Sequence, residues 1–197
     1  MKRFAALLSL LLLPLAEATA TAPIGFDAAV QQLRSAVGLW DVETTQYTDD
    51  GKVARVARGS YRFDWVVPDR VLAGRSDVPD WNLASGLLFY VNQRRATIEM
   101  ASVGADGNLL VMTGPAGEET RTTPAVPTGD GGTMQLRFTR FNVARDRFES
   151  RMEVSLDGGS SWKPGNHQVF SRPRAVAGES AGGLRFRKRP QPYVPLT

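Results

Sequence analysis

The sequence predicts an all-β protein, an antiparallel up-and-down barrel of about eight to ten strands that follows one short N-terminal helix. Three observations predict this fold. From residue 38 onward, apolar and polar residues alternate with a period of two, turn residues recur about every ten positions, and the links between segments are short. This pattern is typical of a sandwich or a barrel, and closure into a barrel removes exposed strand edges.

The first elements are a helix and a hairpin. The helix is expected over residues 26–37, because apolar residues recur there at three- and four-residue spacing and a glycine, Gly38, follows. Residues 40–45 alternate as a first strand, and the turn residues 49–51 lead into a second strand that includes residues 60–65. One face of that second strand carries three aromatic residues: Tyr61, Phe63 and Trp65.

The middle of the chain predicts a second hairpin. Residues 87–91 and 96–100 alternate as strands around a turn at residues 92–94. A further turn at residues 105–108 leads into a strand over residues 109–113. These elements continue the meander.

The last strands are expected over residues 134–138, 148–154 and 167–172, of which the first two pair as a hairpin. The weakest part of the pattern is the stretch 114–132, which is polar and rich in glycine, proline and threonine. Such a stretch is either a lid or hides an element. We expect a poor extra strand at residues 120–125.

Residues 1–20 are predicted to be a secretory signal peptide. A basic pair precedes an apolar stretch over residues 4–13, and alanines then recur at every second position. The rule that small residues flank the cleavage site places cleavage after Ala18 or Ala20. The protein is therefore expected to be secreted or periplasmic.

The remaining chain divides into one domain, residues 21–174, and a basic, proline-containing tail, residues 175–197, that lacks periodicity. The tail is expected to be disordered, with weak electrostatic contact to anionic surfaces at most. A pI of about 9.8 would suit nucleic acid in the cytoplasm, but export argues against that partner. The sequence contains no cysteine, which excludes disulfides and thiol chemistry, and no second apolar stretch is long enough for a transmembrane segment.

A short motif, Gly38-Leu39-Trp40, follows the helix at the start of the first strand. Together with Arg172 in the last strand, it resembles the G-x-W signature that opens lipocalins and their calycin relatives. The resemblance implies a barrel in which Arg172 packs across Trp40. Over residues 26–173 the chain also resembles uncharacterised secreted lipocalin-like domains of bacteria, through three runs: Pro68-Asp69-Arg70, Ala96-Thr97-Ile98-Glu99-Met100, and Asp157-Gly158-Gly159 with Trp162.

No cofactor and no metal site are predicted. Haem-binding barrels of this kind open with a longer G-x-W-x-G-x-G run, whereas here Val42 and Glu43 follow Asp41. His167, the single histidine of the sequence, is expected to be a satisfied surface or core residue. Its alternative role, an axial haem ligand, applies only if haem is bound. One histidine also falls short of the three or four ligands that zinc needs.

The candidate ligand-binding residues follow from strand alternation, because every second side chain of a strand faces the same side. Aromatic residues and methionines dominate the face that we expect to point inward, which favours a cavity over a filled core. These candidates are Tyr61, Phe63, Trp65, Phe89, Met100, Phe138, Arg140 and Met152.

Two polar residues, Arg140 and Asn142, extend the inward face of the strand at residues 134–138. A buried arginine must be paired or must meet a ligand, because an unpaired buried charge is costly. Two interpretations stay open. Arg140 either lies at the barrel end, where it reaches solvent or a salt bridge to Glu or Asp, or it anchors an anionic group of a ligand.

Two motifs match known signatures in letters only. The run G-E-S-A-G around Ser180 reads like the nucleophile elbow of esterases, but no buried strand precedes it and His167 lies upstream. The run at residues 155–162 matches the Asp-box of sialidase propellers, a folding device of which one copy cannot build a propeller. It predicts a structural hairpin in which Asp157 accepts backbone donors and Trp162 packs beneath. No catalytic residue is therefore predicted.

The sequence favours a binding barrel for a small apolar or amphipathic molecule. The first alternative is a non-enzymatic structural or interaction protein with a filled core. The second alternative is a haem-binding barrel or an enzyme, although no set of acid, base and nucleophile can be assembled. Interior volume discriminates the first two readings, because a filled barrel leaves no room for a ligand.

Overall fold

The computed structural model describes residues 25–129 and 131–174. The predicted signal peptide, with its cleavage after Ala18 or Ala20, lies outside these residues. The predicted tail and Ser180 also lie outside them. Across the described part of the chain, no helix is both long and apolar enough to cross a membrane.

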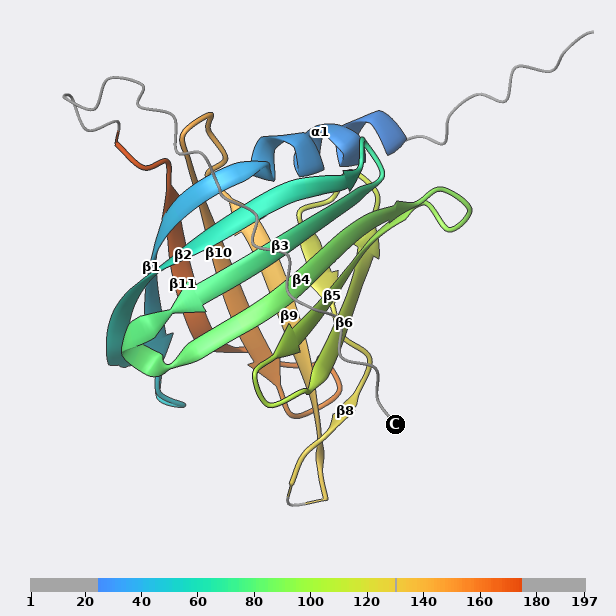
Figure 1. The fold of residues 1–197 in the computed structure, drawn as a ribbon. Coiled ribbons are helices and arrows are strands. Elements are labelled where there is room, and N and C mark those ends of the chain that lie inside the picture. The colour runs from blue at the N-terminus through green and yellow to red at the C-terminus, as the bar shows by residue number, and fades with distance from the viewer. Residues whose placement is uncertain (1–24, 130, 175–197) are drawn as a thin grey trace, which may run out of the picture.

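The described residues form a closed antiparallel β-barrel with one helix, α1 (Phe26–Ala36), across one end (Figure 1). Within these residues, ten strands build the barrel wall. They are β1 (Gly38–Tyr47), β2 (Val53–Val67), β3 (Val71–Val78), β4 (Leu83–Asn92), β5 (Thr97–Gly104), β6 (Leu109–Pro115), β7 (Thr120–Thr122), β9 (Thr133–Phe141), β10 (Arg147–Ser155) and β11 (Lys163–Ser171). The predicted fold class, an all-β antiparallel barrel after a short helix, is confirmed.

The strands follow one another around the wall almost in chain order. Strands β1 to β6 each pair with the next, and β7 lies between β6 and β9. The pairings of β9 with β10, of β10 with β11 and of β11 with β1 complete the circle. Two short elements lie beside this wall. The two-residue strand β8 (Val126–Pro127) pairs with β9, and the turn of 3-10 helix η1 (Pro79–Trp81) precedes β4.

The predicted hairpins lie at the expected residues. Phe89 pairs with Met100 across β4 and β5, and Phe138 pairs with Met152 across β9 and β10. β3 is not among the strands that the sequence predicted, because its alternating pattern is weak where Gly74 takes an inward position. A Cβ at that position would lie 2.5 Å from the ring of Phe63, so the strand needs glycine there.

The stretch 114–132 contains a strand, but one shorter than expected. β7 takes three residues of the predicted strand at 120–125, and Pro124 follows, which has no N–H for a ladder. One register pair, Thr113 with Thr122, joins β7 to β6, whereas three pairs join β7 to β9. β7 is thus the shortest strand of the described barrel wall.

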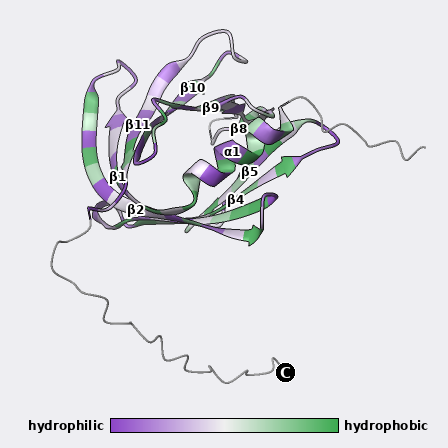
Figure 2. Ribbon diagram, turned by 90° about the horizontal axis from the view of Figure 1, so that it is seen from above, coloured by the Kyte–Doolittle hydropathy of each residue, from purple (hydrophilic) through white to green (hydrophobic). Residues whose placement is uncertain are grey.

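α1 lies inside the ring of strands and closes one end of the barrel (Figure 2). Its apolar face, which includes Phe26, Val30 and Leu33, is buried in the core cluster that also contains Trp40. Full burial of such side chains stabilises the fold by about 1.5–3 kcal/mol each. The helix ends at Ala36, one residue before the predicted end, and the Ala36 carbonyl accepts the indole N–H of Trp40 at 2.8 Å.

The G-x-W motif has the geometry that its resemblance implies. The guanidinium of Arg172 lies across the indole of Trp40, 3.6 Å from the ring centroid, and donates to the carbonyl oxygens of Val37 and Leu39. Gly38 has a φ of +108°, and a Cβ there would lie 2.5 Å from Nη1 of Arg172. Position 38 therefore requires glycine both for its backbone conformation and for the close approach of the arginine.

The hairpin between β10 and β11 is held by Asp157. This carboxylate accepts hydrogen bonds from the backbone N–H and the hydroxyl of Ser161 at 2.9 and 2.6 Å, and from the hydroxyl of Ser155 at 2.7 Å. These hydrogen bonds, with that of the Ser161 hydroxyl first, lower the pKa of Asp157 to about 2. The indole of Trp162 donates to the Gly159 carbonyl at 3.1 Å. The contacts are those of a structural turn.

Candidate ligand-binding site

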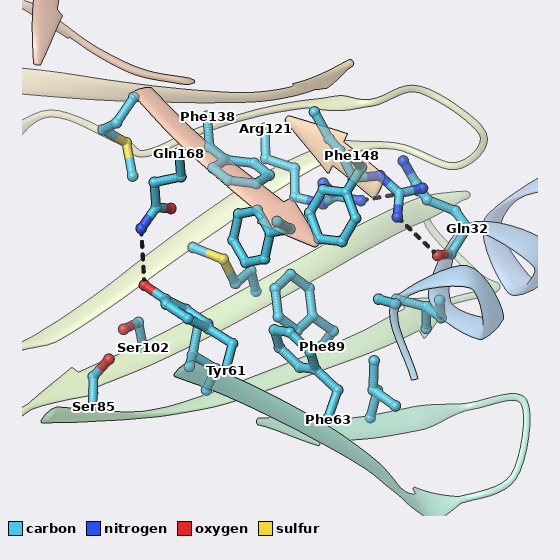
Figure 3. Close-up of a pocket in the computed structure, with 18 of the residues that line it drawn as sticks. Gln32, Tyr61, Phe63, Ser85, Phe89, Ser102, Arg121, Phe138, Phe148 and Gln168 are labelled. Atoms are coloured by element: carbon cyan, nitrogen blue, oxygen red, sulfur yellow. Dashed lines mark hydrogen bonds between the residues drawn. The ribbon is translucent and has the colours of Figure 1, made fainter. Parts of the chain in front are cut away.

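The barrel encloses a cavity of about 180 Å³, bounded at one end by α1 (Figure 3). Apolar side chains dominate its walls. For scale, an engineered apolar cavity of about 150 Å³ binds benzene. Seven of the eight predicted interior residues line it: Tyr61, Phe63, Phe89, Met100, Phe138, Arg140 and Met152.

Trp65 is the exception, because it does not line the cavity. It shares a face of β2 with Tyr61 and Phe63 but lies nearer the end of the strand, where the pairing with β3 becomes irregular. There its side chain packs, partly buried, against the core cluster that includes α1. Alternation gave the correct face of the strand, but it does not tell how far along the barrel axis the cavity extends.

Several residues line the cavity that were not predicted from the sequence. Phe148, Gln168 and Phe170 lie on inward positions of β10 and β11, and strand alternation could have found them. Gln32 and Leu33 come from α1, and no strand pattern indicates which helix residues reach the interior. The remaining lining residues include Leu72, Leu87, Leu110, Ser85, Ser102, Asn166 and Arg121.

The middle of the cavity is walled by aromatic rings that fix one another. Phe148 and Phe170 stack with centroids 4.2 Å apart, and Tyr61 meets Phe170 edge-on at 5.2 Å. On the facing side, Phe63 and Phe89 meet edge-on at 6.0 Å. Such aromatic pairs contribute about 0.5–1.5 kcal/mol each beyond their burial. The aromatic wall is therefore already shaped without a ligand.

The end of the cavity away from α1 carries neutral polar groups, which we call the hydroxyl end: Tyr61, Ser85, Ser102 and Gln168 (Figure 3). The amide nitrogen of Gln168 donates to the hydroxyls of Thr44 and Tyr61 at 3.1 and 3.2 Å, and its oxygen accepts from Ser150 at 3.3 Å. The phenol oxygen of Tyr61 is thus an acceptor. Its own proton has no acceptor in the described part of the chain, so it is free to bond to a ligand.

Four polar residues gather at the other end of the cavity, beside α1, and we call them the charged end. Gln32, Arg121 and Arg140 line the cavity, and Glu119 binds to them without lining it. Arg140 is buried and fully paired. Its Nε and Nη2 donate to the two carboxylate oxygens of Glu119, both at 2.8 Å, and its Nη1 donates to the Ser35 hydroxyl at 2.9 Å and the Gln32 carbonyl at 3.3 Å. Of the two interpretations of Arg140, the structure contains the salt bridge.

The carboxyl group of Glu119 responds to this pairing. Burial alone would raise its pKa, but the hydrogen bond and the charge of Arg140, together with a hydrogen bond from Gln32, lower the pKa below the ordinary value of 4.5. Glu119 is therefore ionised at neutral pH, and its negative charge balances one of the two buried arginines.

Arg121 is the second buried arginine at this end, and it was not predicted from the sequence. Only 3% of it is exposed, and within the described residues its guanidinium forms one hydrogen bond, from Nη2 to the side-chain oxygen of Gln32 at 2.9 Å. Its Nε is buried without a partner in that part of the chain. Burial and, to a smaller extent, the charge of Arg140 lower the pKa of Arg121 to about 10, although the charge of Glu119 raises it. Arg121 nevertheless stays charged at neutral pH.

His167 does not point into the cavity. Its strand neighbour Gln168 lines the interior, so alternation places His167 on the outer face of β11. There its Nε2 lies 2.8 Å from a carboxylate oxygen of Glu149, and its ring stacks on Phe141. Asn142, expected to face inward, instead has a φ of +50°, is exposed, and donates to Glu149. The geometry therefore offers no axial haem ligand from His167.

A metal site is not found among the residues that the structure describes, because no three His, Cys, Asp or Glu side chains gather there in a way that could hold an ion. The polar groups of the cavity are amides, hydroxyls and guanidinium groups. Amides and hydroxyls bind polar atoms of organic molecules, and guanidinium groups bind anions. The arrangement suits the binding of a small molecule that has both apolar and polar parts.

The sequence matches no model of a known protein family and no curated protein. Three solved structures are similar in fold. They are a redesigned β-barrel (13% identity, 72% of this chain and 95% of that chain covered, TM-score 0.38), EF1p2_mFAP2b bound to DFHBI (13%, 74% and 98%, 0.37), and the S-type phycobiliprotein lyase CPES from Guillardia theta (9%, 77% and 98%, 0.41).

Proposed function

We propose that this barrel binds a small amphipathic molecule whose apolar part is about the size of one aromatic ring. The observation that carries the proposal is the cavity of about 180 Å³ with its preformed aromatic wall. A barrel filled by its own side chains would leave no such space. Small-molecule sites combine apolar walls with a few polar groups that fix orientation, and both polar ends of this cavity fit that description.

The proposal also covers where the protein acts and that it is not an enzyme. We take the ligand to be bound outside the cytoplasm, by a binding protein without catalytic activity. Sequencing the N-terminus of the protein secreted by its source tests the location, because cleavage after Ala18 or Ala20 leaves Thr19 or Thr21 first. An uncleaved N-terminus on protein in the cytoplasm would contradict it.

Binding is tested with neutral ring compounds, namely indole, benzyl alcohol and 3-phenylpropanol, by calorimetry and thermal unfolding. A ligand at about 100 times its Kd adds about 2.7 kcal/mol to the free energy of unfolding. We expect binding by wild type and its loss in Ser102→Phe, because Ser102 lines the cavity and a phenyl group there occupies it. The matched control is Thr113→Phe, at an exposed position of β6, which should bind as wild type does.

Two outcomes would contradict the proposal. If wild type binds neither these neutral compounds nor carboxylic acids of similar size, the cavity does not serve a ligand. A structural or interaction role is then the better interpretation. If Ser102→Phe and Thr113→Phe bind equally well, the ligand lies outside the cavity.

A further inference from the structure

The charged end of the cavity has an unbalanced charge. Among the lining residues of the described chain, the ionisable cations are Arg121 and Arg140, and no carboxylate lines the cavity. Glu119 lies outside this lining, and both of its carboxylate oxygens accept hydrogen bonds from Arg140. Arg121 forms no ion pair within 4.0 Å in the described residues. One positive charge is thus left over in a buried, largely apolar place.

Leaving a guanidinium in this state is costly. An arginine has five N–H donors, and Arg121 uses one of its nitrogens, Nη2, for a hydrogen bond within the described chain. Nε is buried and has no partner among the described residues. Water can accept such N–H groups but does not balance a charge. An unsatisfied buried group in a native fold needs an explanation, and a role in binding an anion is one that also balances the charge.

The position of Arg121 is fixed by its neighbours. Gln32 holds Nη2 through its side-chain oxygen, while its nitrogen donates to the carbonyl of Glu118 at 3.0 Å and to the carboxylate of Glu119. The guanidinium carbon of Arg121 also lies 5.9 Å from the ring centroid of Phe89. The free part of the guanidinium is therefore preorganised next to the aromatic wall (Figure 3).

We propose that the ligand is a small carboxylic acid, bound as its carboxylate, with the carboxylate paired to Arg121 and the apolar body among the aromatic rings. This inference rests on the proposed function and names its ligand class. A planar carboxylate matches the guanidinium fork, and its single negative charge balances the single unpaired positive charge. A dianion such as a phosphate monoester would leave one negative charge buried in turn.

The test compares an acid and an alcohol of nearly the same shape, 3-phenylpropionate and 3-phenylpropanol, by calorimetry at neutral pH. We expect wild type to bind the acid about tenfold more tightly than the alcohol, the size of effect that a charge-assisted hydrogen bond gives. In Arg121→Met, binding of the acid should weaken about tenfold, whereas binding of the alcohol should change less than about twofold. Arg121→Lys should keep part of the preference, because the charge remains without the planar fork.

The matched control is Arg151→Met, which removes the same charge from an exposed position on the outer face of β10. It should bind both compounds as wild type does. Equal loss in Arg151→Met and Arg121→Met would show that net charge alone attracts the acid, and would overturn the proposal.

Failure of this inference is distinct from failure of the proposed function. If wild type binds the alcohol as tightly as the acid, the cavity binds ligands but the assignment of Arg121 is wrong. If wild type binds neither compound, the proposed function itself fails. The comparison on wild type decides the question even if Arg121→Met does not fold.

Discussion

Arg140 on β9 and Arg121 on β7 lie at the same end of the cavity, on paired strands, and are buried to a similar extent. Yet Arg140 has a partner for every guanidinium nitrogen, whereas the guanidinium of Arg121 has one hydrogen bond and no ion pair within 4.0 Å among the residues that the structure describes. The first arginine is part of the scaffold. The second keeps unused hydrogen-bonding capacity, and this difference, not burial, separates a structural arginine from a candidate binding residue.

Among the variants that test this difference between the two arginines, Glu119→Gln is expected to change the free energy of unfolding most. Glutamine keeps the size of the side chain but leaves two buried guanidinium groups without a counter-charge. We expect the free energy of unfolding to fall by about 3 kcal/mol, the low end for a broken buried pair because 36% of the Glu119 side chain is exposed. Urea denaturation measures it. Glu118→Gln, at the exposed neighbouring position, should be as stable as wild type, and equal stability of both variants would contradict the pairing argument.

Arg121→Met should change the free energy of unfolding in the opposite direction from Glu119→Gln. It removes an unpaired buried charge, so we expect the free energy of unfolding to rise by about 1 kcal/mol, offset in part by the lost bond to Gln32. Arg140→Met should instead lower it by about 3 kcal/mol. Thermal and urea denaturation of the two variants side by side give the comparison. If both variants lose stability to the same extent, the two arginines do not differ as described.

A smaller loss of stability is expected at a partly buried arginine outside the cavity, Arg172. Arg172→Met loses the contact with the Trp40 ring, and cation–π contacts contribute about 0.5–2 kcal/mol. We expect a loss of about 1 kcal/mol in urea denaturation and unchanged ligand binding, because Arg172 does not line the cavity. Weakened binding of 3-phenylpropionate would show that the G-x-W end and the charged end are coupled.

The smallest expected effect is the pH dependence of the stability that the ion pair of Glu119 and Arg140 contributes. The folded state lowers the pKa of Glu119 below 4.5, so the unfolded state binds more protons between these two values. The stabilisation is therefore fully present above the unfolded pKa and is lost as pH falls through the folded pKa. The difference in free energy of unfolding between wild type and Glu119→Gln should be constant from pH 7 to about 5 and should shrink below 4.5. A difference that stays constant down to pH 3 would contradict the assignment.

Strand alternation was sufficient to predict the barrel and most of its inward face. The pairing of Phe89 with Met100, and of Phe138 with Met152, follows from apolar residues on strands linked by short turns. Arg140 was expected to face inward for the same reason. The pattern did not tell where the cavity ends along the barrel, which is why Trp65 was included.

The partners of the charged residues could not be predicted from periodicity. Gln32 is separated from Arg121 by 89 positions in the sequence, and it comes from a helix whose rotation over the barrel end is set by packing. Arg121 itself lies in a strand of three residues, too short to show alternation. Whether a buried arginine is paired depends on contacts between such distant segments, and these appear only in the folded structure.

The short strand β7 has a consequence for access to the interior. A wall segment joined to β6 at a single register position, Thr113 with Thr122, separates at a lower free-energy cost than the long hairpins around it, so amide hydrogens there should exchange with solvent soonest. The same segment carries Arg121. The seam that opens most readily therefore lies beside the unpaired guanidinium, and a molecule can reach it through a local fluctuation while the rest of the barrel stays folded.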